Sequence, residues 1–142
     1  IIIDCPPSLG MLTVNAFTVS DEIIIPVEAA YFSLKGLIKL SETIETVKEY
    51  TNDKLEVRGV LFTKYNKRYN ISKEMTSAAT EISRVIGAKI FKTYIRRTIT
   101  VDEAQAAGSD LINFNKPSTA EDDYKAFTEE YLKEVGDFDG RR

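Results

Sequence analysis

Apolar residues in this chain fall into two spacings: short unbroken runs, and longer stretches in which they recur every three or four positions. The run Ile1–Ile3 has no polar alternation, which is typical of a central parallel strand covered by helices on both faces. Pro26 cannot donate to a strand ladder, so we expect it at the end of its strand or on an unpaired side. The apolar runs predict strands at Ile1–Ile3, Ile23–Val27, Val57–Thr63, Lys89–Tyr94 and Leu111–Phe114.

Helical spacing fills the intervals between these strands. Ser33 is an expected N-cap, and Ser118 with Glu121 three residues later forms a capping box. Gly87 and Gly108 are expected to end the helices that precede them. The predicted helices are Leu12–Val19, Ser33–Tyr50, Ile71–Ile86, Val101–Ala107 and a last helix from Ser118 to Gly136. Strands that alternate with helices predict a layered α/β fold, a parallel sheet flanked by helices.

Length and composition indicate one domain, because 142 residues that are 43% hydrophobic can bury a sizeable core. We expect residues 1–136 to form this domain and residues 137–142 to be a disordered tail. No apolar run approaches the roughly 18 residues of a membrane span, which favours a cytoplasmic protein. Cys5 is the single cysteine and the chain has no histidine, so we interpret it as a buried structural thiol rather than a nucleophile.

Charge is segregated along the chain. Residues 1–53 carry three Lys/Arg and eight Asp/Glu, whereas residues 54–97 carry eleven and three, a net charge of +8. Residues 98–142 are again acidic, with five Lys/Arg and eleven Asp/Glu. A basic middle segment of this kind indicates a footprint for a polyanion, although folding can still scatter the charges over the surface.

Two carboxylates are expected at the carboxyl ends of strands, where open α/β sheets bind their ligands. Asp4 follows the first strand directly, and Pro6–Pro7 should stop the strand beside it. A functional carboxylate and a simple turn are equally good interpretations of Asp4 from these residues alone. Glu28 follows the second strand, and there a solvated loop carboxylate is the stronger interpretation.

An ordered set of motifs resembles the second half of a ParA/Soj-type chromosome or plasmid partitioning ATPase. The segments are IIIDCPPSLG at residues 1–10, Pro26-Val27, YFSLKGL at residues 31–37, GVLFT at residues 59–63, Glu103-Ala104 and Gly108. The resemblance runs to about Leu132 and implies the P-loop NTPase fold of the ParA/MinD superfamily, whose Walker A loop is deviant. Residues 1–142 contain no such glycine-rich loop. We therefore expect the C-terminal portion of a longer protein; a truncated gene is the alternative.

The resemblance also implies site residues. Asp4 matches the Walker B-type carboxylate that helps to hold Mg²⁺, usually through water, and is the expected catalytic and metal-side group. Two further sets carry over from the family: nucleotide-binding positions at Asp4, Pro6, Thr63, Lys64 and Arg96, and DNA-binding positions at Lys67, Arg68 and Arg97. Physically, the loop at residues 63–70 suits a polyanion, because its cations can neutralise phosphates while Tyr65 and Tyr69 pack against sugars or bases. The alternative is an ordinary solvated polar loop.

One segment departs from the family pattern. Relatives read close to V-I-P-R-N-V-R-L-S-E-A-P where this chain has residues 94–105, so Arg97 matches but Arg96 replaces the proline that borders the adenine. Thr100 replaces a second arginine and Gln105 replaces the last proline. Arg96 thus places a flexible cation where the family has a rigid ring.

The implied role is plasmid or chromosome segregation in the cytoplasm, at the nucleoid if DNA binding holds. In the intact protein, a homodimer would enclose ATP and Mg²⁺ and bind DNA nonspecifically, and a centromere-binding, ParB-like partner would stimulate hydrolysis. This chain by itself lacks the P-loop and is expected to be inactive. The alternative function is a non-enzymatic remnant that acts as a self-association or interaction module. Membrane-site selection, as in the MinD group, is disfavoured because residues 124–142 are acidic rather than a basic membrane anchor.

Overall fold

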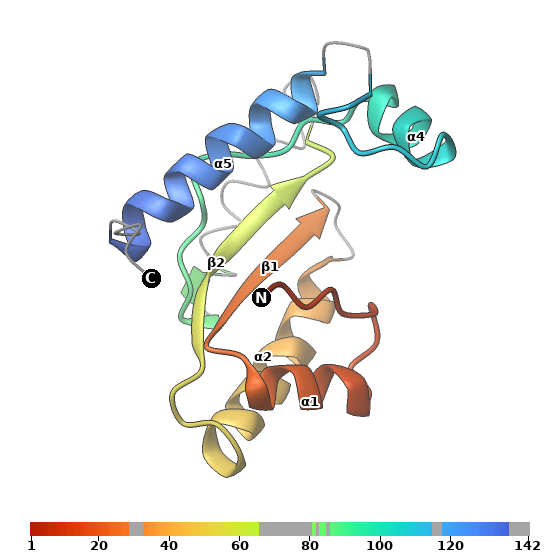
Figure 1. The fold of residues 1–142 in the computed structure, drawn as a ribbon. Helices are drawn as coiled ribbons and strands as arrows, with labels where there is room; N and C mark the ends of the chain where they lie inside the picture. The colour runs from red at the N-terminus through yellow and green to blue at the C-terminus, as the bar shows by residue number, and fades with distance from the viewer. Residues whose placement is uncertain (29–32, 66–80, 82, 85, 115–117, 137–142) are drawn as a thin grey trace.

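The computed structural model describes residues 1–28, 33–65, 81, 83–84, 86–114 and 118–136. Strands and helices alternate through it, which confirms the expected layered α/β architecture (Figure 1). The elements are α1 (Met11–Val19), β1 (Glu22–Glu28), α2 (Ser33–Tyr50), β2 (Glu56–Thr63), α4 (Ile99–Ala106) and α5 (Thr119–Val135). The helix predicted at residues 71–86 lies mostly outside the described residues, as do the expected tail and the loop residues Lys67 and Arg68.

Strands β1 and β2 pair in parallel, as their apolar runs predict. Ile23 lies opposite Val57 and Val27 opposite Phe62, with an irregularity in register after Ile23. A parallel pair needs a crossover, and α2 supplies it on one face of the sheet. The other edge of β1 has no strand beside it within the described residues, so Pro26 removes no ladder bond there.

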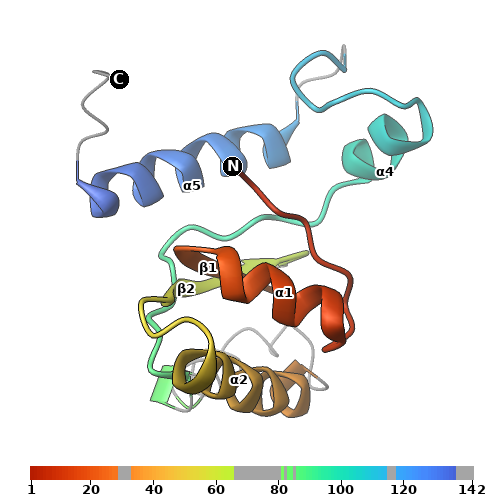
Figure 2. The ribbon, with the colours of Figure 1, turned by 60° about the horizontal axis from the view of Figure 1, so that its bottom comes forward.

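The two faces of the sheet are covered differently. Figure 2 shows α1 and α2 on one face and α5 over the other. Alternate residues of β1 and β2 point toward α1 and α2 and form the larger core with Phe17, Leu37, Ile44, Val47 and Leu55. On the opposite face, Leu61 packs with Phe91, Ile95 and Ala120 beneath α5. Ala120, Phe127 and Tyr131 of α5 thus face the sheet, whereas Tyr124 and Val135 on the same helix are exposed.

The segment predicted as a fourth strand runs beside β2 without forming a continuous ladder. Isolated parallel bridges join Val60 to Ile90 and Tyr65 to Arg96. Between them, the backbone N–H groups of Lys92 and Thr93 donate to the Glu130 carboxylate on α5, at 2.7 and 2.8 Å. The segment therefore lies where the strand was predicted, but it does not form a regular strand. The Glu130 carboxylate accepts the backbone N–H groups that a regular strand would donate to its neighbour.

Two strand predictions are wrong. Ile1–Ile3 pairs with no strand among the described residues and Ile2 is 98% exposed, because an apolar run becomes a strand only when a neighbour accepts its backbone hydrogen bonds. The segment at residues 111–114 is a turn. There the Asp110 carboxylate accepts the Asn113 backbone N–H at 2.8 Å, and the Phe114 N–H donates to the Asp110 carbonyl. This local bonding replaces an edge strand.

Helix ends follow the predicted signals. The Ser118 hydroxyl accepts the Ala120 N–H at the start of α5, as expected of an N-cap. The predicted capping box is incomplete in the described contacts, because the Glu121 side chain pairs with Lys125 one turn later. Gly87 and Gly108 adopt positive φ angles of 63° and 64°, which end the helices before them. No helix in the described part of the chain is long and apolar enough to cross a bilayer.

Candidate functional site

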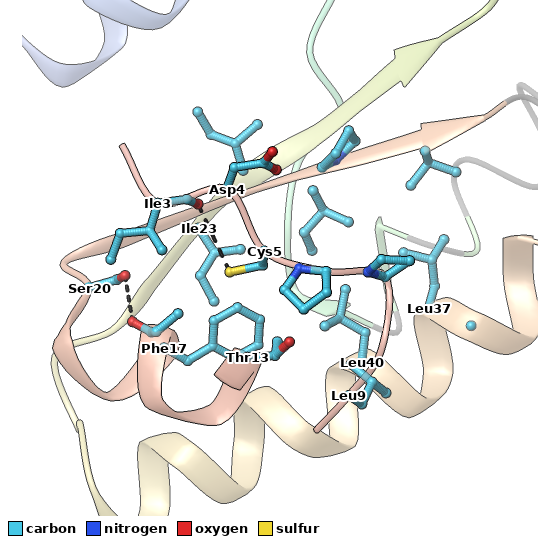
Figure 3. A pocket seen from close by; sticks show the side chains of 18 of the residues that line it. Ile3, Asp4, Cys5, Leu9, Thr13, Phe17, Ser20, Ile23, Leu37 and Leu40 are labelled. Carbon is cyan, nitrogen blue, oxygen red and sulfur yellow. Dashed lines mark hydrogen bonds between the residues drawn. The ribbon is translucent and has the colours of Figure 1, made fainter. Parts of the chain in front are cut away.

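A groove of about 860 Å³ lies between residues 2–7 and β1. The motif Asp4-Cys5-Pro6-Pro7 lines this groove. Its floor comes from α1 and α2 and is largely apolar (Figure 3). Asp4 is exposed on the strand side of this groove, and Cys5 points its sulfur toward α1. Asp4 thus follows a segment without assigned strand structure rather than the carboxyl end of a strand, which was the position predicted for it.

The motif loop is tied to α1. Thr13 is buried, and its hydroxyl donates to the Ser8 carbonyl at 2.6 Å. Pro6 lines the groove and lacks a backbone N–H, which fits a loop that no strand flanks. Cys5 is half-buried rather than buried, with its sulfur 3.9 Å from the Ile3 carbonyl oxygen.

The carboxyl ends of β1 and β2 bring a second group of predicted residues together. Thr63 lies opposite Glu28 in the register, and Lys64 Nζ is 3.3 Å from Glu28 Oε2. Lys64 has a φ of 50°, a left-handed conformation that costs a non-glycine residue on the order of 1 kcal/mol. Tyr65 follows, and its ring centroid lies 4.4 Å from the ring centroid of Tyr94. The strained backbone of Lys64 and its ion pair with Glu28 therefore both lie at the carboxyl edge of the sheet, where α/β proteins bind ligands.

Arg96 is held by α5. Its guanidinium makes a two-pronged contact with Asp123, at 2.7 to 3.0 Å, and Nη2 also donates to the Thr119 carbonyl. The Arg96 backbone N–H donates to the same carboxylate at 2.9 Å. Burial alone would raise the pKa of Asp123, but the Arg96 hydrogen bonds outweigh it and lower that pKa. The side chain placed at the base by family resemblance is thus bound to a helix in this structure.

Of the predicted DNA-binding residues, only Arg97 is described. It is exposed, and its backbone N–H donates to the Tyr65 carbonyl at 3.2 Å, which fixes it beside the Lys64 loop. Half of the described cations in the basic middle segment are neutralised by folding, since Arg58, Lys64, Lys89 and Arg96 each form an ion pair. Within the described ranges, Lys54, Arg84, Lys92 and Arg97 form none.

Sequence reasoning missed a polar cluster that joins three elements. Glu22 at the start of β1 accepts a hydrogen bond from Arg58 of β2 at 2.5 Å and from the Tyr131 hydroxyl of α5 at 2.6 Å. The Arg58 hydrogen bond lowers the pKa of Glu22, while the bond to Glu22 raises the pKa of Tyr131. The sequence did contain a signal for this cluster, because Arg58 is a charged residue inside the strand predicted at Val57–Thr63. A charged side chain in a strand that a helix covers needs a polar partner.

The described residues offer limited metal ligation. No three acidic, cysteine or histidine side chains among them gather closely enough to hold a metal ion. Asp4 would therefore contribute a single carboxylate, and a single carboxylate suits Mg²⁺, which keeps several waters and completes its shell with phosphate oxygens.

Several known proteins are similar to this chain in sequence. A family model described as an AAA domain matches residues 1–57. The sporulation initiation inhibitor protein Soj of Bacillus subtilis is 38% identical over 124 residues, which are 87% of this chain and 48% of Soj. The chromosome partitioning protein ParA of Caulobacter vibrioides is 33% identical over 137 residues, covering 96% of this chain and 50% of ParA.

Solved structures show the same fold. Cobyrinic acid a,c-diamide synthase from Mycobacterium smegmatis superposes with a TM-score of 0.71 at 25% identity, covering 97% of this chain and 47% of the synthase. Apo McdA from Cyanothece superposes with a TM-score of 0.72 at 19% identity, covering 90% and 51%. The synthase has also been solved with an ATP analog and magnesium. The chain spans about half the length of the curated relatives it matches, and it belongs to the ParA/Soj group of the MinD/ParA family, with the α/β fold of P-loop NTPases.

Proposed function

We propose that this chain supplies the metal-side and base-side portion of a ParA-type partitioning ATPase that acts in plasmid or chromosome segregation. One observation carries the proposal: Thr63, Lys64 and Arg97 meet at the carboxyl edge of the β1–β2 pair, and Asp4 faces the groove along the same strand β1. Parallel sheets bind nucleotides at this edge. Since the chain spans about half of its relatives, the remaining groups would come from residues outside it.

Each site residue has a definite role in this proposal. Asp4 would hold Mg²⁺ through water, and bound Mg²⁺ would neutralise charge on the phosphate oxygens. Pro6, Thr63 and Lys64 would border the nucleotide. Arg96 would reach the base only after leaving Asp123, so we expect it to contribute less than the proline found in relatives. The phosphates need backbone N–H groups and lysines of a P-loop, which residues 1–142 do not contain.

DNA binding and assembly follow from the same family role. Arg97 would contact phosphates without reading sequence, together with Lys67 and Arg68, which lie outside the described residues. The intact protein would act in the cytoplasm, at the nucleoid, as a homodimer with a ParB-like, centromere-binding partner. Hydrolysis would then release the dimer from DNA.

Isothermal titration of Mg²⁺-ATP tests the nucleotide part. The chain would be compared with a version extended upstream to include a P-loop, each with and without Asp4→Ala. We expect binding in the extended version only, and weaker Mg²⁺-dependent binding after Asp4→Ala. Asp53→Ala is a matched control, because Asp53 is an exposed carboxylate in the loop before β2. Equal binding by the Asp4→Ala and Asp53→Ala variants would contradict the assignment of Asp4.

A further inference from the structure

The backbone around Arg96 is held from two sides. On one side, the Tyr65 N–H donates to the Ile95 carbonyl at 3.0 Å, and the Arg97 N–H donates to the Tyr65 carbonyl at 3.2 Å. Successive N–H groups of an extended chain point to opposite sides, so the Arg96 N–H points away from Tyr65. It donates to the Asp123 carboxylate at 2.9 Å. The backbone at Arg96 is therefore fixed between the end of β2 and α5.

Asp123 holds the side chain of Arg96 as well as its backbone. The carboxylate contacts Nε and Nη2 of Arg96 at 2.7 to 3.0 Å, and Nη2 also donates to the Thr119 carbonyl at 3.1 Å. The Asp123 side chain is only 12% exposed. A two-pronged contact with such a carboxylate restricts both partners more than a single contact between two exposed side chains. One residue of α5 thus fixes Arg96 at its N–H and at its guanidinium.

Arg97 depends on this backbone for its position. Its side chain is exposed and forms no ion pair with any residue that the structure describes. Side chains of an extended chain alternate in direction, so Arg97 leaves the backbone on the side opposite to the Arg96–Asp123 contact. A cation on a fixed backbone loses less conformational freedom when it meets a phosphate, and its contact is stronger for that reason. Asp123 therefore acts on Arg97 through the backbone that the two arginines share.

We propose that Asp123 is a positioning residue, which holds the backbone at Arg96 so that Arg97 is presented to phosphate at the carboxyl edge of the sheet. The proposal rests on the proposed function, which assigns Arg97 to DNA phosphates. It extends that function to α5, a helix that contains none of the proposed nucleotide or DNA positions. Asp123 itself acts only through Arg96.

Masking of the Arg96 charge is the competing role for Asp123. An ion pair alone would mask the guanidinium, and it would not require the Arg96 N–H to donate to the same carboxylate. Masking also predicts that removal of Asp123 frees a cation and strengthens DNA binding, while the contribution of Arg97 stays the same. Positioning predicts instead that the contribution of Arg97 falls.

Backbone order parameters, measured by NMR relaxation on the folded chain, test the positioning itself. In Asp123→Ala, the values at residues 96 and 97 should fall from about 0.85 to about 0.6 or below, while the value at Val60 stays unchanged. The Val60 N–H donates to the Lys89 carbonyl at the other end of the same segment, and a loss of stability alone leaves the order parameters of the folded protein unchanged. Asp122→Ala is the matched control, because Asp122 is an exposed carboxylate on the same helix.

The conservative variant Asp123→Asn separates the two contacts. Asparagine keeps an acceptor for the Arg96 N–H but loses the charge, so the order parameters should fall between those of the parent and of Asp123→Ala. If Asp123→Ala does not fold, Asp123→Asn compared with Asp122→Asn decides in the same way. Order parameters at residues 96 and 97 that match those of the Asp122 control would overturn the proposal.

Fluorescence anisotropy with duplex DNA tests the effect on Arg97. The loss of affinity caused by Arg97→Ala should be at least about threefold smaller in the Asp123→Ala chain than in the parent, because the backbone that presents Arg97 is already loose. An equal loss in both chains, which masking predicts, would overturn the proposal. If the parent chain binds no DNA, the proposed DNA contact of Arg97 fails, and the order parameters still decide whether Asp123 positions the segment.

Discussion

At the scale of single residues, α5 is fastened by carboxylates that each take more than one donor. Asp123 takes the side chain and the backbone N–H of Arg96, and Glu130 takes two successive backbone N–H groups. Burial would raise the pKa of Asp123 and of Glu130, but the hydrogen bonds lower both. A lowered pKa means that the ionised form stabilises the fold.

The first prediction concerns acid stability. An aspartate with a lowered folded-state pKa contributes stability that is fully present above about pH 4 and is lost as the pH falls below that value. Asp123→Asn should therefore lower the unfolding free energy at pH 7 by about 1 kcal/mol, after allowing for the half-exposed Arg96. It should also make the unfolding free energy depend less on pH below about pH 4. Urea denaturation at several pH values measures both effects, and an unchanged dependence on pH would contradict the assignment.

The second prediction concerns the missed cluster. Tyr131→Phe removes the hydroxyl that donates to Glu22, so it should cost about 1 kcal/mol of unfolding free energy. Tyr124→Phe is the matched control on the same helix, because Tyr124 is 44% exposed. Thermal or urea denaturation compares the two variants. Equal stability of the Tyr131→Phe and Tyr124→Phe proteins would show that the Tyr131–Glu22 hydrogen bond contributes nothing.

At the scale of elements, close backbone contact holds the segment at residues 89–97 against β2. A Cβ atom on Gly59 would lie 2.8 Å from the Phe91 ring and 3.0 Å from the Lys89 carbonyl oxygen. Phe91 in turn meets Phe127 of α5 edge-on, with ring centroids 4.9 Å apart. Gly59 therefore allows β2, the segment at residues 89–97 and α5 to pack closely, and a side chain at residue 59 would push that segment away from β2.

The third prediction is a pair of glycine variants. Gly59→Ala should lower the unfolding free energy by about 1 to 3 kcal/mol, because one contact is with backbone that cannot turn aside. Gly36→Ala should raise it by up to about 1 kcal/mol, since Gly36 lies in α2 with nothing within 4 Å of the new methyl group. Denaturant midpoints measure both, and the opposite order of stability would refute this account of the packing.

At the scale of the whole molecule, folding pairs several basic residues of the middle third with carboxylates from other parts of the chain. Ion pairs with Glu22, Glu28, Glu134 and Asp123 neutralise cations that a linear count assigns to a polyanion footprint. Arg97 stays exposed and without an ion pair among the described residues. The exposed positive surface of the described residues is therefore smaller than the net charge of the segment suggests.

The fourth prediction tests that surface. Arg97→Ala should weaken DNA binding similarly on unrelated duplex sequences and lower the slope of log K against log salt by about one. Lys54→Ala should have little effect, because Lys54 is an exposed cation without an ion pair near the opposite end of β2. Fluorescence anisotropy at several salt concentrations gives both slopes. Sequence-dependent loss, or an equal loss for Lys54→Ala, would contradict nonspecific binding through Arg97.

Local patterns were sufficient for most elements and for the family. Helices α1, α2, α4 and α5 and strands β1 and β2 were predicted within a few residues, because apolar periodicity, caps and glycine stops act over short distances. The ordered motifs from Asp4 to Gly108 likewise identified the ParA/Soj group without any coordinates. The candidate site was predicted as a set of positions, of which the structure brings Thr63, Lys64 and Arg97 to one edge.

Pairings between distant residues were decided only by the tertiary structure. The composition of Ile1–Ile3 favours a strand, but a strand forms only where another chain segment accepts its hydrogen bonds. Arg96 carries the same charge in every environment, yet its contact with Asp123 depends on how α5 crosses the sheet. The sequence by itself therefore determined most of the elements and their order, since these follow from local chemistry, and its ordered motifs indicated the family by resemblance. The tertiary structure determined which of the described charges form ion pairs and which strands pair with each other, since these depend on neighbours far apart in the chain.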